Sequence, residues 1–233
     1  ASYMAGYDVI RLVASTEFSS RDRRAVRTTA QNLIGLEPVQ ETETEVVLKS
    51  LLDASDVSIR QSLVQLQYTA VSMHEDATEA VVSRDDDLAR QVQDRDDEAD
   101  RLFGMIERHF QRALTDLEEI DALEVSRPTL FDYYTTARQL ERVADHAVKI
   151  AMIASHLEET LLSELQDDLA PLANQSRDIV KDATSVLLED ATVTTAYETL
   201  EICDDVTDDI TALDRALYED GTSGGYHLTL VLD

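Results

Sequence analysis

Pairs of acidic residues four positions apart are the feature of this sequence best suited to chemistry. Residues i and i+4 of a helix share one face, with Cβ atoms roughly 5–6 Å apart. The two negative charges repel each other, and a hard cation would relieve this repulsion by taking the carboxylate oxygens as ligands. Three pairs stand out: Asp96 with Asp100, Glu141 with Asp145, and Asp204 with Asp208.

The pair Glu141–Asp145 also has explanations that need no metal. Arg138 and Arg142 lie close by in the sequence and could compensate the repulsion. The chain contains 48 acidic residues, so pairs with this spacing also arise by chance on solvated helix surfaces. The metal, the arginine and the surface explanations therefore all stay open at this point.

The position of Glu141 and Asp145 on their helix favours the metal. At about 100° per residue, the two acids share a stripe with Val148 and Met152, while the main apolar stripe lies on another side. A stripe that mixes acidic and apolar residues is not expected to be freely solvated. We therefore expect it to meet a neighbouring helix or a partner surface.

No other motif indicates catalysis. His146 follows Asp145, but adjacent helical residues point about 100° apart, so His146 is predicted to be a capping or surface residue. The other four histidines show no ligand spacing, and Cys203 is expected in packing. There is no glycine-rich phosphate loop, no H-E-x-x-H, no Glu-x-x-His pair and no recognisable nucleophile with its base. The sequence therefore predicts that the protein is not an enzyme.

Long helices must position the acidic pairs, because residues that break helices are rare. No glycine occurs between Gly35 and Gly104 or between Gly104 and Gly221, and the chain has only three prolines. This distribution, with apolar residues at three- and four-residue spacing, predicts long helices. We expect them at about 53–83, about 85–120, from just after Pro128 to about 162, at about 163–190 and at about 192–220.

These helices predict a mainly α fold of up-and-down bundles with an internal repeat. A shift of 108 residues places Asp96 on Asp204 and Asp100 on Asp208. The helix lengths agree with the same offset. The predicted division is a small N-terminal element at 1–52, a first three-helix repeat at 53–162 and a second, incomplete repeat at 163–233.

The N-terminal element is predicted to be of the β-α-β type. Its helix can be capped by Ser19 or Ser20 and is placed to end at Gly35. A stable sheet usually needs three or more strands, so this element is expected to lean on the helices, on a partner chain or on upstream sequence. The exposed sheet leads us to expect a homodimer. The predicted strands are 7–14, about 36–40 and about 44–48.

The charge of the chain restricts its surroundings and its partners. The net charge of −28 opposes binding of nucleic-acid phosphates by the bulk surface. Only three of the 20 basic residues are lysines, and an acidic surface with so little lysine is typical of adaptation to molar salt, where self-repulsion is screened. An acidic protein from a low-salt organism is the alternative. No membrane-spanning run or signal sequence is visible, and a single cysteine fits the cytoplasm, where we expect the protein.

The stretch ARQLERVADHAVKIA at residues 137–151 resembles the signature of the PhoU family, regulators of phosphate uptake. That signature runs roughly R-x-L-E-R-x-x-D-H-x-x-N-I-A, and RDDEADRL at 95–102 looks like the family's other acidic motif. The resemblance implies a PhoU-like repeat of three-helix bundles, of which the second is truncated here. The matching residues are Arg138, Leu140, Glu141, Arg142, Asp145, His146, Ile150 and Ala151.

The resemblance also implies a role and a cofactor. The role is regulation of phosphate uptake by contact with a phosphate ABC transporter or a phosphate-sensing histidine kinase at the inner face of the membrane. The cofactor is a divalent or trivalent metal ion such as iron, manganese, magnesium or zinc. Asp96, Asp100, Glu141 and Asp145 would form the site of the first repeat, and Asp204 and Asp208 half of the second.

Two features set the chain apart from the family pattern. Lys149 replaces the usual Asn and Met152 replaces the usual Glu, which weakens the case for a multinuclear metal cluster. The first fifty residues resemble the segment that follows an AbrB-like DNA-binding domain in archaeal PhoU-like proteins. That domain is absent from this chain, so DNA binding is expected only through a missing upstream domain.

Two other classes of protein remain as alternatives. One is a ferritin-like, carboxylate-bridged metal protein, which would need histidine ligands near the acids. The other is a metal-free acidic helical scaffold, whose acidic pairs serve only salt tolerance.

Overall fold

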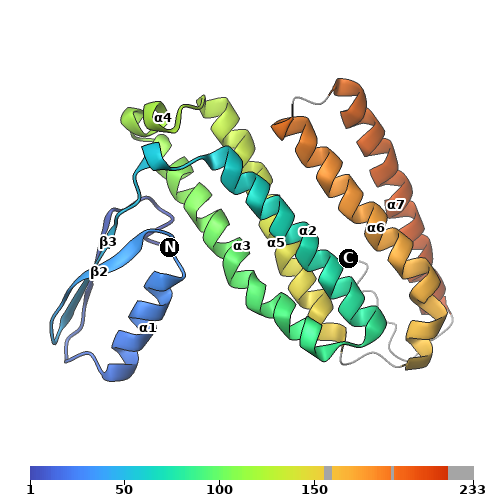
Figure 1. Cartoon of the computed structure of the whole chain (residues 1–233), viewed down its shortest axis with the longest axis horizontal. Coiled ribbons are helices and arrows are strands. Elements are labelled where there is room, and N and C mark those ends of the chain that lie inside the picture. The colour runs from blue at the N-terminus through green and yellow to red at the C-terminus, as the bar shows by residue number, and fades with distance from the viewer. Residues whose placement is uncertain (155–158, 190–191, 220–233) are drawn as a thin grey trace. The chain divides into compact units, whose positions relative to one another are not determined.

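The computed structural model describes the backbone of residues 1–154, 159–189 and 192–219 (Figure 1). Helices dominate these residues, and strands occur only near the N-terminus, so the predicted mainly α fold with a small α/β element is confirmed. The predicted loop at 221–225 and the segment after it lie outside the described residues.

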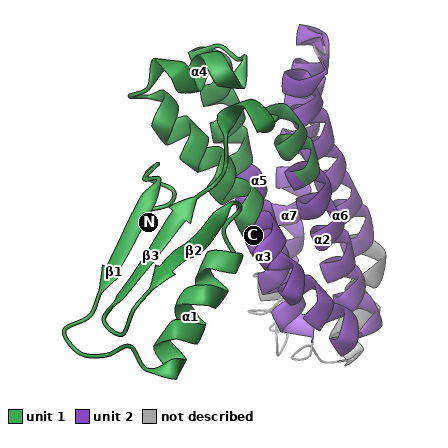
Figure 2. Ribbon diagram, turned by 60° about the vertical axis from the view of Figure 1, so that its left-hand side comes forward, with its two compact units in different colours: residues 1–65, 100–138 green, residues 66–99, 139–233 purple. Residues whose placement is uncertain are grey.

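The chain divides into two compact units, which Figure 2 colours separately. Unit 1 consists of residues 1–65 and 100–138, and unit 2 of residues 66–99 with the described residues from 139 onward. The predicted division at 53–162 and 163–233 rests on a sequence repeat rather than on contacts, and it stays a prediction. The helices that contribute to both units are α2 (Ile59–Ser83), α3 (Asp86–Ala113) and α5 (Arg127–Ile153).

The N-terminal sheet of unit 1 has the strand order β1-β3-β2, with β3 antiparallel to both neighbours. β1 and β2 therefore run parallel to each other, and the chain passes through α1 between them, as in the predicted β-α-β element. In the register, Ile10 pairs with Leu48 and Leu36 pairs with Ser50. The strands are β1 (Val9–Val13), β2 (Leu36–Glu41) and β3 (Glu45–Ser50).

Helix α1 (Ser20–Gln31) begins where its capping signal predicts. Ser19 accepts a hydrogen bond from the Asp22 amide, and the Asp22 carboxylate accepts one from the Ser19 amide at 3.0 Å, which forms a capping box. The helix ends at Gln31 with Asn32 as its C-cap, earlier than the predicted end, and the turn into β2 is made at Gly35. Its φ is +73°, and a Cβ atom there would lie 3.0 Å from Leu52 Cβ.

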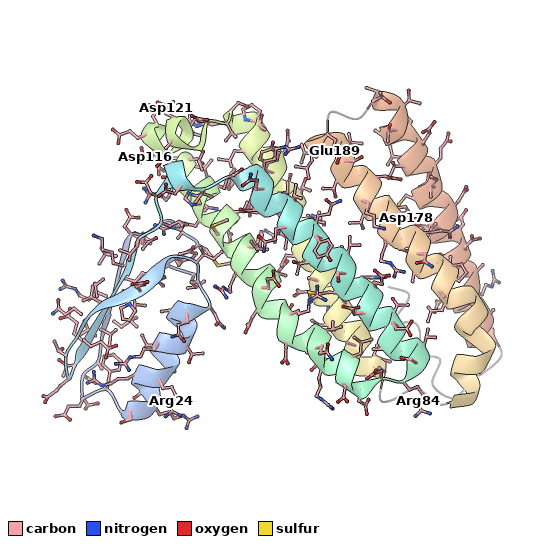
Figure 3. The ribbon with its side chains drawn as sticks, in the orientation of Figure 1. Arg24, Arg84, Asp116, Asp121, Asp178 and Glu189 are labelled. Carbon is pink, nitrogen blue, oxygen red and sulfur yellow. The ribbon has the colours of Figure 1, made fainter. Side chains whose placement is uncertain are left out.

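Two helices are shorter than predicted: α2 begins later and α3 ends earlier. The helix predicted from residue 53 begins at Ile59, because Asp53 caps a separate 3₁₀ turn, η1 (Ala54–Asp56). The helix predicted to reach residue 120 ends at Ala113. Asp116 (Figure 3) has an extended backbone and accepts a hydrogen bond from the Glu118 amide at 2.9 Å, so it starts a new helix, α4 (Leu117–Leu123).

The boundaries of the remaining helices also differ from the predicted ones. The helix predicted to run to residue 162 is α5, which ends at Ile153, and the next helix, α6 (Glu159–Leu188), begins before the predicted residue 163. The last described helix, α7 (Val193–Glu219), closely follows the predicted 192–220. Residues 155–158 lie outside the described part of the chain.

Unit 2 buries aliphatic stripes at the three- and four-residue spacing that the sequence predicts. Helices α6 and α7 pack side by side (Figure 1). No helix in the described ranges combines the length and the apolar character needed to cross a membrane. The buried residues include Leu66, Ala70, Met73, Ala77, Val92, Leu140, Ala147 and Ile150.

Candidate functional site

Each predicted acidic pair lies on a single helix, so the i, i+4 geometry of the pairs is confirmed. The first pair is on α3, the second on α5 and the third on α7. Asp96 and Glu141 are half-buried, and the other four acids are exposed. Among the residues that the structure describes, no three His, Cys, Asp or Glu side chains form a group that could hold a metal ion. One pair supplies at most two ligands, and the assignment of a metal to these residues stays a prediction.

The mixed stripe on α5 is only partly shielded from solvent. Glu141 and Val148 are half-buried, whereas Asp145 and Met152 are exposed, Met152 to 57%. The expectation of a stripe removed from solvent is therefore right for two of its four members.

A cavity of about 480 Å³ lies within unit 2. Residues from successive turns of α2, α5 and α6 line it. Ile210 of α7 contributes to the apolar part of the wall, with valine, leucine and isoleucine side chains of the other helices. The titratable groups in the wall are His74 of α2, Arg142, Asp145, His146 and Lys149 of α5, and Arg177 of α6.

The wall of this cavity reverses the charge balance of the chain. Acidic residues outnumber Lys and Arg by 48 to 20 in the sequence, yet Arg142, Lys149 and Arg177 face a single carboxylate, Asp145, in the wall. This net positive charge makes the cavity itself suited to an anion.

Arg177 is the most unusual of these residues, because its guanidinium is buried and its partners are neutral. The side chain is 8% exposed, and one terminal nitrogen lies 3.2 Å from His74 Nδ1, while the other donates to Asn174 Oδ1. Within the described residues, no carboxylate forms an ion pair with Arg177. A buried cation is costly unless an opposite charge compensates it.

His74 is held neutral by its surroundings. Its pKa is lowered from 6.5 to about 4, first by burial and then by the positive charges of Arg177 and His146. Neutral imidazole can accept a hydrogen bond at Nδ1, so the contact with Arg177 is one in which the guanidinium donates.

This cavity was not predicted from the sequence. His146 was predicted to be a capping or surface residue, but it is half-buried and lines the cavity, because the side of α5 that it shares with Arg142 and Lys149 faces α2 and α6. A signal was present: residues 142, 146 and 149 follow the i, i+4, i+7 spacing of one helix face. No such local signal brings Arg177 to His74.

A second group of titratable side chains is buried in unit 1. Glu119 of α4 is 5% exposed and accepts hydrogen bonds from Arg112 Nε at 2.7 Å and, at 2.5 Å, from His109 Nδ1. Burial alone would raise the pKa of Glu119, but the hydrogen bonds and charges of His109 and Arg112 outweigh it and hold the pKa below its ordinary value. Both oxygens of Glu119 thus accept hydrogen bonds from buried or half-buried side chains of α3.

The same network anchors the N-terminal segment to α3. Arg108 is 1% exposed and donates to the carbonyl oxygens of Tyr3 at 3.0 Å and Tyr7 at 2.8 Å. The Asp8 carboxylate accepts from Arg108 at 2.5 Å and from Arg112 at 2.6 Å. These contacts within unit 1 join the residues before β1 to a helix about a hundred positions later.

Comparison with known proteins finds one similarity, in the middle of the chain. Residues 63–154 match the model of the PhoU domain family. No curated protein matches the chain. The match begins in the second turn of α2, includes α3 and α4, and ends just after α5, so it contains both acidic motifs that resemble the family. The helical segment 63–154 of this protein is thus similar to the PhoU domain, which supports a PhoU family protein.

Proposed function

We propose that this protein is located in the cytoplasm and regulates phosphate uptake by binding a phosphate ABC transporter or a phosphate-sensing histidine kinase. The observation that carries this proposal is the match of residues 63–154 to the PhoU domain family. The long helices of this segment would supply the surface that a partner protein contacts. No catalytic role is assigned to the acidic pairs, because a regulator of this kind acts by binding.

The regulatory role can be tested in the native host by deleting the gene. Cells without the protein are expected to take up labelled phosphate faster than wild-type cells when phosphate is abundant, because uptake is no longer restrained. Re-expression of the wild-type chain should restore the lower rate. Equal uptake rates in the two strains, in both abundant and scarce phosphate, would contradict the proposal.

Contact with the partner can be tested separately by chemical cross-linking in cells, followed by identification of the attached peptides. We expect peptides of the transporter or of the sensor kinase to be joined to α2, α3 or α5. Regulation without either cross-link would show that the partner belongs to another class.

We further propose that the acidic pairs bind a hard metal ion. What supports this is the i, i+4 placement of each pair on one helix. Two carboxylates with water completing the coordination suit Mg²⁺, which is commonly bound in this way, and Mn²⁺ or Fe²⁺ would fit the same oxygens.

The double variant Glu141→Gln with Asp145→Asn is expected to contain less metal and to gain less thermal stability from Mn²⁺ or Fe²⁺, because both ligands of one pair lose their charge. Metal analysis of protein purified without chelator and thermal unfolding with added metal measure the two effects. The matched control is Glu75→Gln with Glu79→Gln, an exposed i, i+4 pair on α2 outside the predicted set. An equal metal loss in both double variants would contradict a specific site.

The homodimer remains a proposal, and the open edges of the N-terminal sheet support it. β1 is an edge strand whose Val9 and Val13 are 53% and 71% exposed. Unpaired edge strands readily pair with a second chain. Light scattering in molar salt is expected to give twice the mass of the chain, and Val13→Lys should shift the equilibrium towards the monomer. A clean monomer for the wild type would refute the dimer.

A further inference from the structure

The cavity of unit 2 combines three properties that each point to an anionic ligand. The first is its fixed charge: Arg142, Lys149 and Arg177 outweigh Asp145, and His74 is neutral near pH 7. The charge of this wall is thus opposite in sign to the net charge of −28 that the chain carries. Low-dielectric walls around it would focus the positive potential and raise the local concentration of anions.

The second property is the buried guanidinium of Arg177. Its planar donors match the oxygen atoms of a phosphate, which it can bind with two parallel hydrogen bonds. Asn174 and His74 hold the side chain by accepting from it, and neither supplies negative charge. An anion in the cavity would provide the missing opposite charge.

The third property is the size and lining of the cavity. Its volume of about 480 Å³ lies in the range of roughly 300–1,000 Å³ that is usual for small-molecule sites. Aliphatic side chains such as Val71, Leu172 and Ile210 form the remainder of the wall. The cavity thus offers a cationic part for oxyanions and an apolar part that could receive the organic portion of a ligand.

We propose that the cavity of unit 2 binds a phosphate group, either free or carried by a small phosphorylated metabolite, between Arg142, Lys149 and Arg177. Arg177 makes the directed contact from the buried end of the site, and the exposed Arg142 and Lys149 attract the anion from solvent. Arg142 donates a hydrogen bond to Gln139 Oε1 at 3.2 Å, which orients its side chain. This proposal rests on the cavity alone and would hold whether or not the protein regulates phosphate uptake.

Isothermal titration calorimetry with the whole chain tests the proposal, at constant ionic strength in chloride salt. Inorganic phosphate and AMP are the two probes, and each is expected to bind with a single site per chain. Tighter binding of AMP would identify a phosphorylated metabolite that uses the apolar wall. Equal or tighter binding of inorganic phosphate would identify the free ion as the ligand.

Charge-removing variants then locate the site. Lys149→Gln and Arg142→Gln alter exposed side chains, so both are expected to fold, and each should raise the Kd of phosphate about tenfold by removing a charged contact. Arg177→Gln should abolish measurable binding.

The matched control is Lys181→Gln. Lys181 lies on α6, is half-exposed and donates to Asp178 (Figure 3) at 2.9 Å, but it does not line the cavity. The control variant should bind phosphate as the wild type does. Absence of binding to both probes at millimolar concentration, or an equal loss in Lys181→Gln and Lys149→Gln, would overturn the proposal. Neither result would bear on the uptake rates of the deletion strain.

Discussion

Replacing Glu119 by alanine is expected to lower the free energy of unfolding by about 3–5 kcal/mol, the usual cost of removing one partner of a buried ion pair. Glu119 is 5% exposed, and both of its oxygens accept hydrogen bonds. Without it, the His109 ring and the Arg112 guanidinium would lose their buried acceptor, and a cavity would remain where the side chain packed. Chemical unfolding at pH 7 measures the effect.

The matched control for this variant is Glu118→Ala. Glu118 is the neighbouring residue on α4, carries the same charge and is exposed, so its loss should change stability by less than about 0.5 kcal/mol. In Glu119→Ala, hydrogen exchange should show the loss of stability in unit 1, because the residues of the network lie on α3 and α4 of that unit. Similar stabilities of the two variants would show that the buried network contributes little.

Acidification should weaken the same network. The pKa values of Asp8 and Glu119 are held below their ordinary values, so the stability that these groups contribute is fully present above the ordinary values of 3.8 and 4.5. It is lost as the pH falls from there through the lowered pKa values of the folded state.

The second large effect on stability comes from His74, and it is expected at a higher pH than the effect of Asp8 and Glu119. Because its pKa falls from 6.5 in the unfolded chain to about 4 in the folded protein, the unfolded state binds a proton in this range that the folded state does not. Stability should therefore be lost as the pH falls from about 6.5 to 4, by roughly 3 kcal/mol in total from this group.

The variant His74→Gln keeps an acceptor for Arg177 but cannot be protonated. The difference in unfolding free energy between wild type and variant should accordingly change by about 3 kcal/mol between pH 7 and pH 4. The charged groups that share the cavity wall with His74 are Arg142, Asp145, His146, Lys149 and Arg177, and all are retained in the variant.

The ring resonances of His74, followed by NMR in chloride buffer, provide an independent measurement. They should titrate near pH 4 rather than near 6.5. A midpoint near 6.5, or parallel stability curves for the two proteins, would contradict the prediction. Phosphate must be left out of these samples, because an anion in the cavity would favour the charged imidazole.

Several features of the fold could be read from the sequence because they depend on neighbouring residues. The cap at Ser19 and the apolar spacing along α2 are local patterns, and the structure confirms both. The break before α4 was missed, although Asp116 is a favourable capping residue, because the apolar spacing continues across it. Helix boundaries depend on such single residues and are therefore harder to predict than helix type.

The placement of each acidic pair on one helix face could also be predicted from residues close in the sequence. Residues four apart share a face of any helix, so Glu141 and Asp145 had to lie together on α5. Whether pairs from different helices meet depends on the packing angles and rotations of those helices. The described residues form no group of three ligands, which sequence spacing could not have indicated.

The sequence by itself determined the helices, their buried stripes and the resemblance of the middle segment to the PhoU domain, since each depends on residue types at short, fixed spacing. Only the tertiary structure decided where the scarce positive charges meet. Arg177 and His74 are 103 positions apart, and the partly buried contact between them exists because α2, α5 and α6 pack around one cavity. Helix packing is set by the sum of many weak apolar contacts, and no short pattern in the chain encodes it.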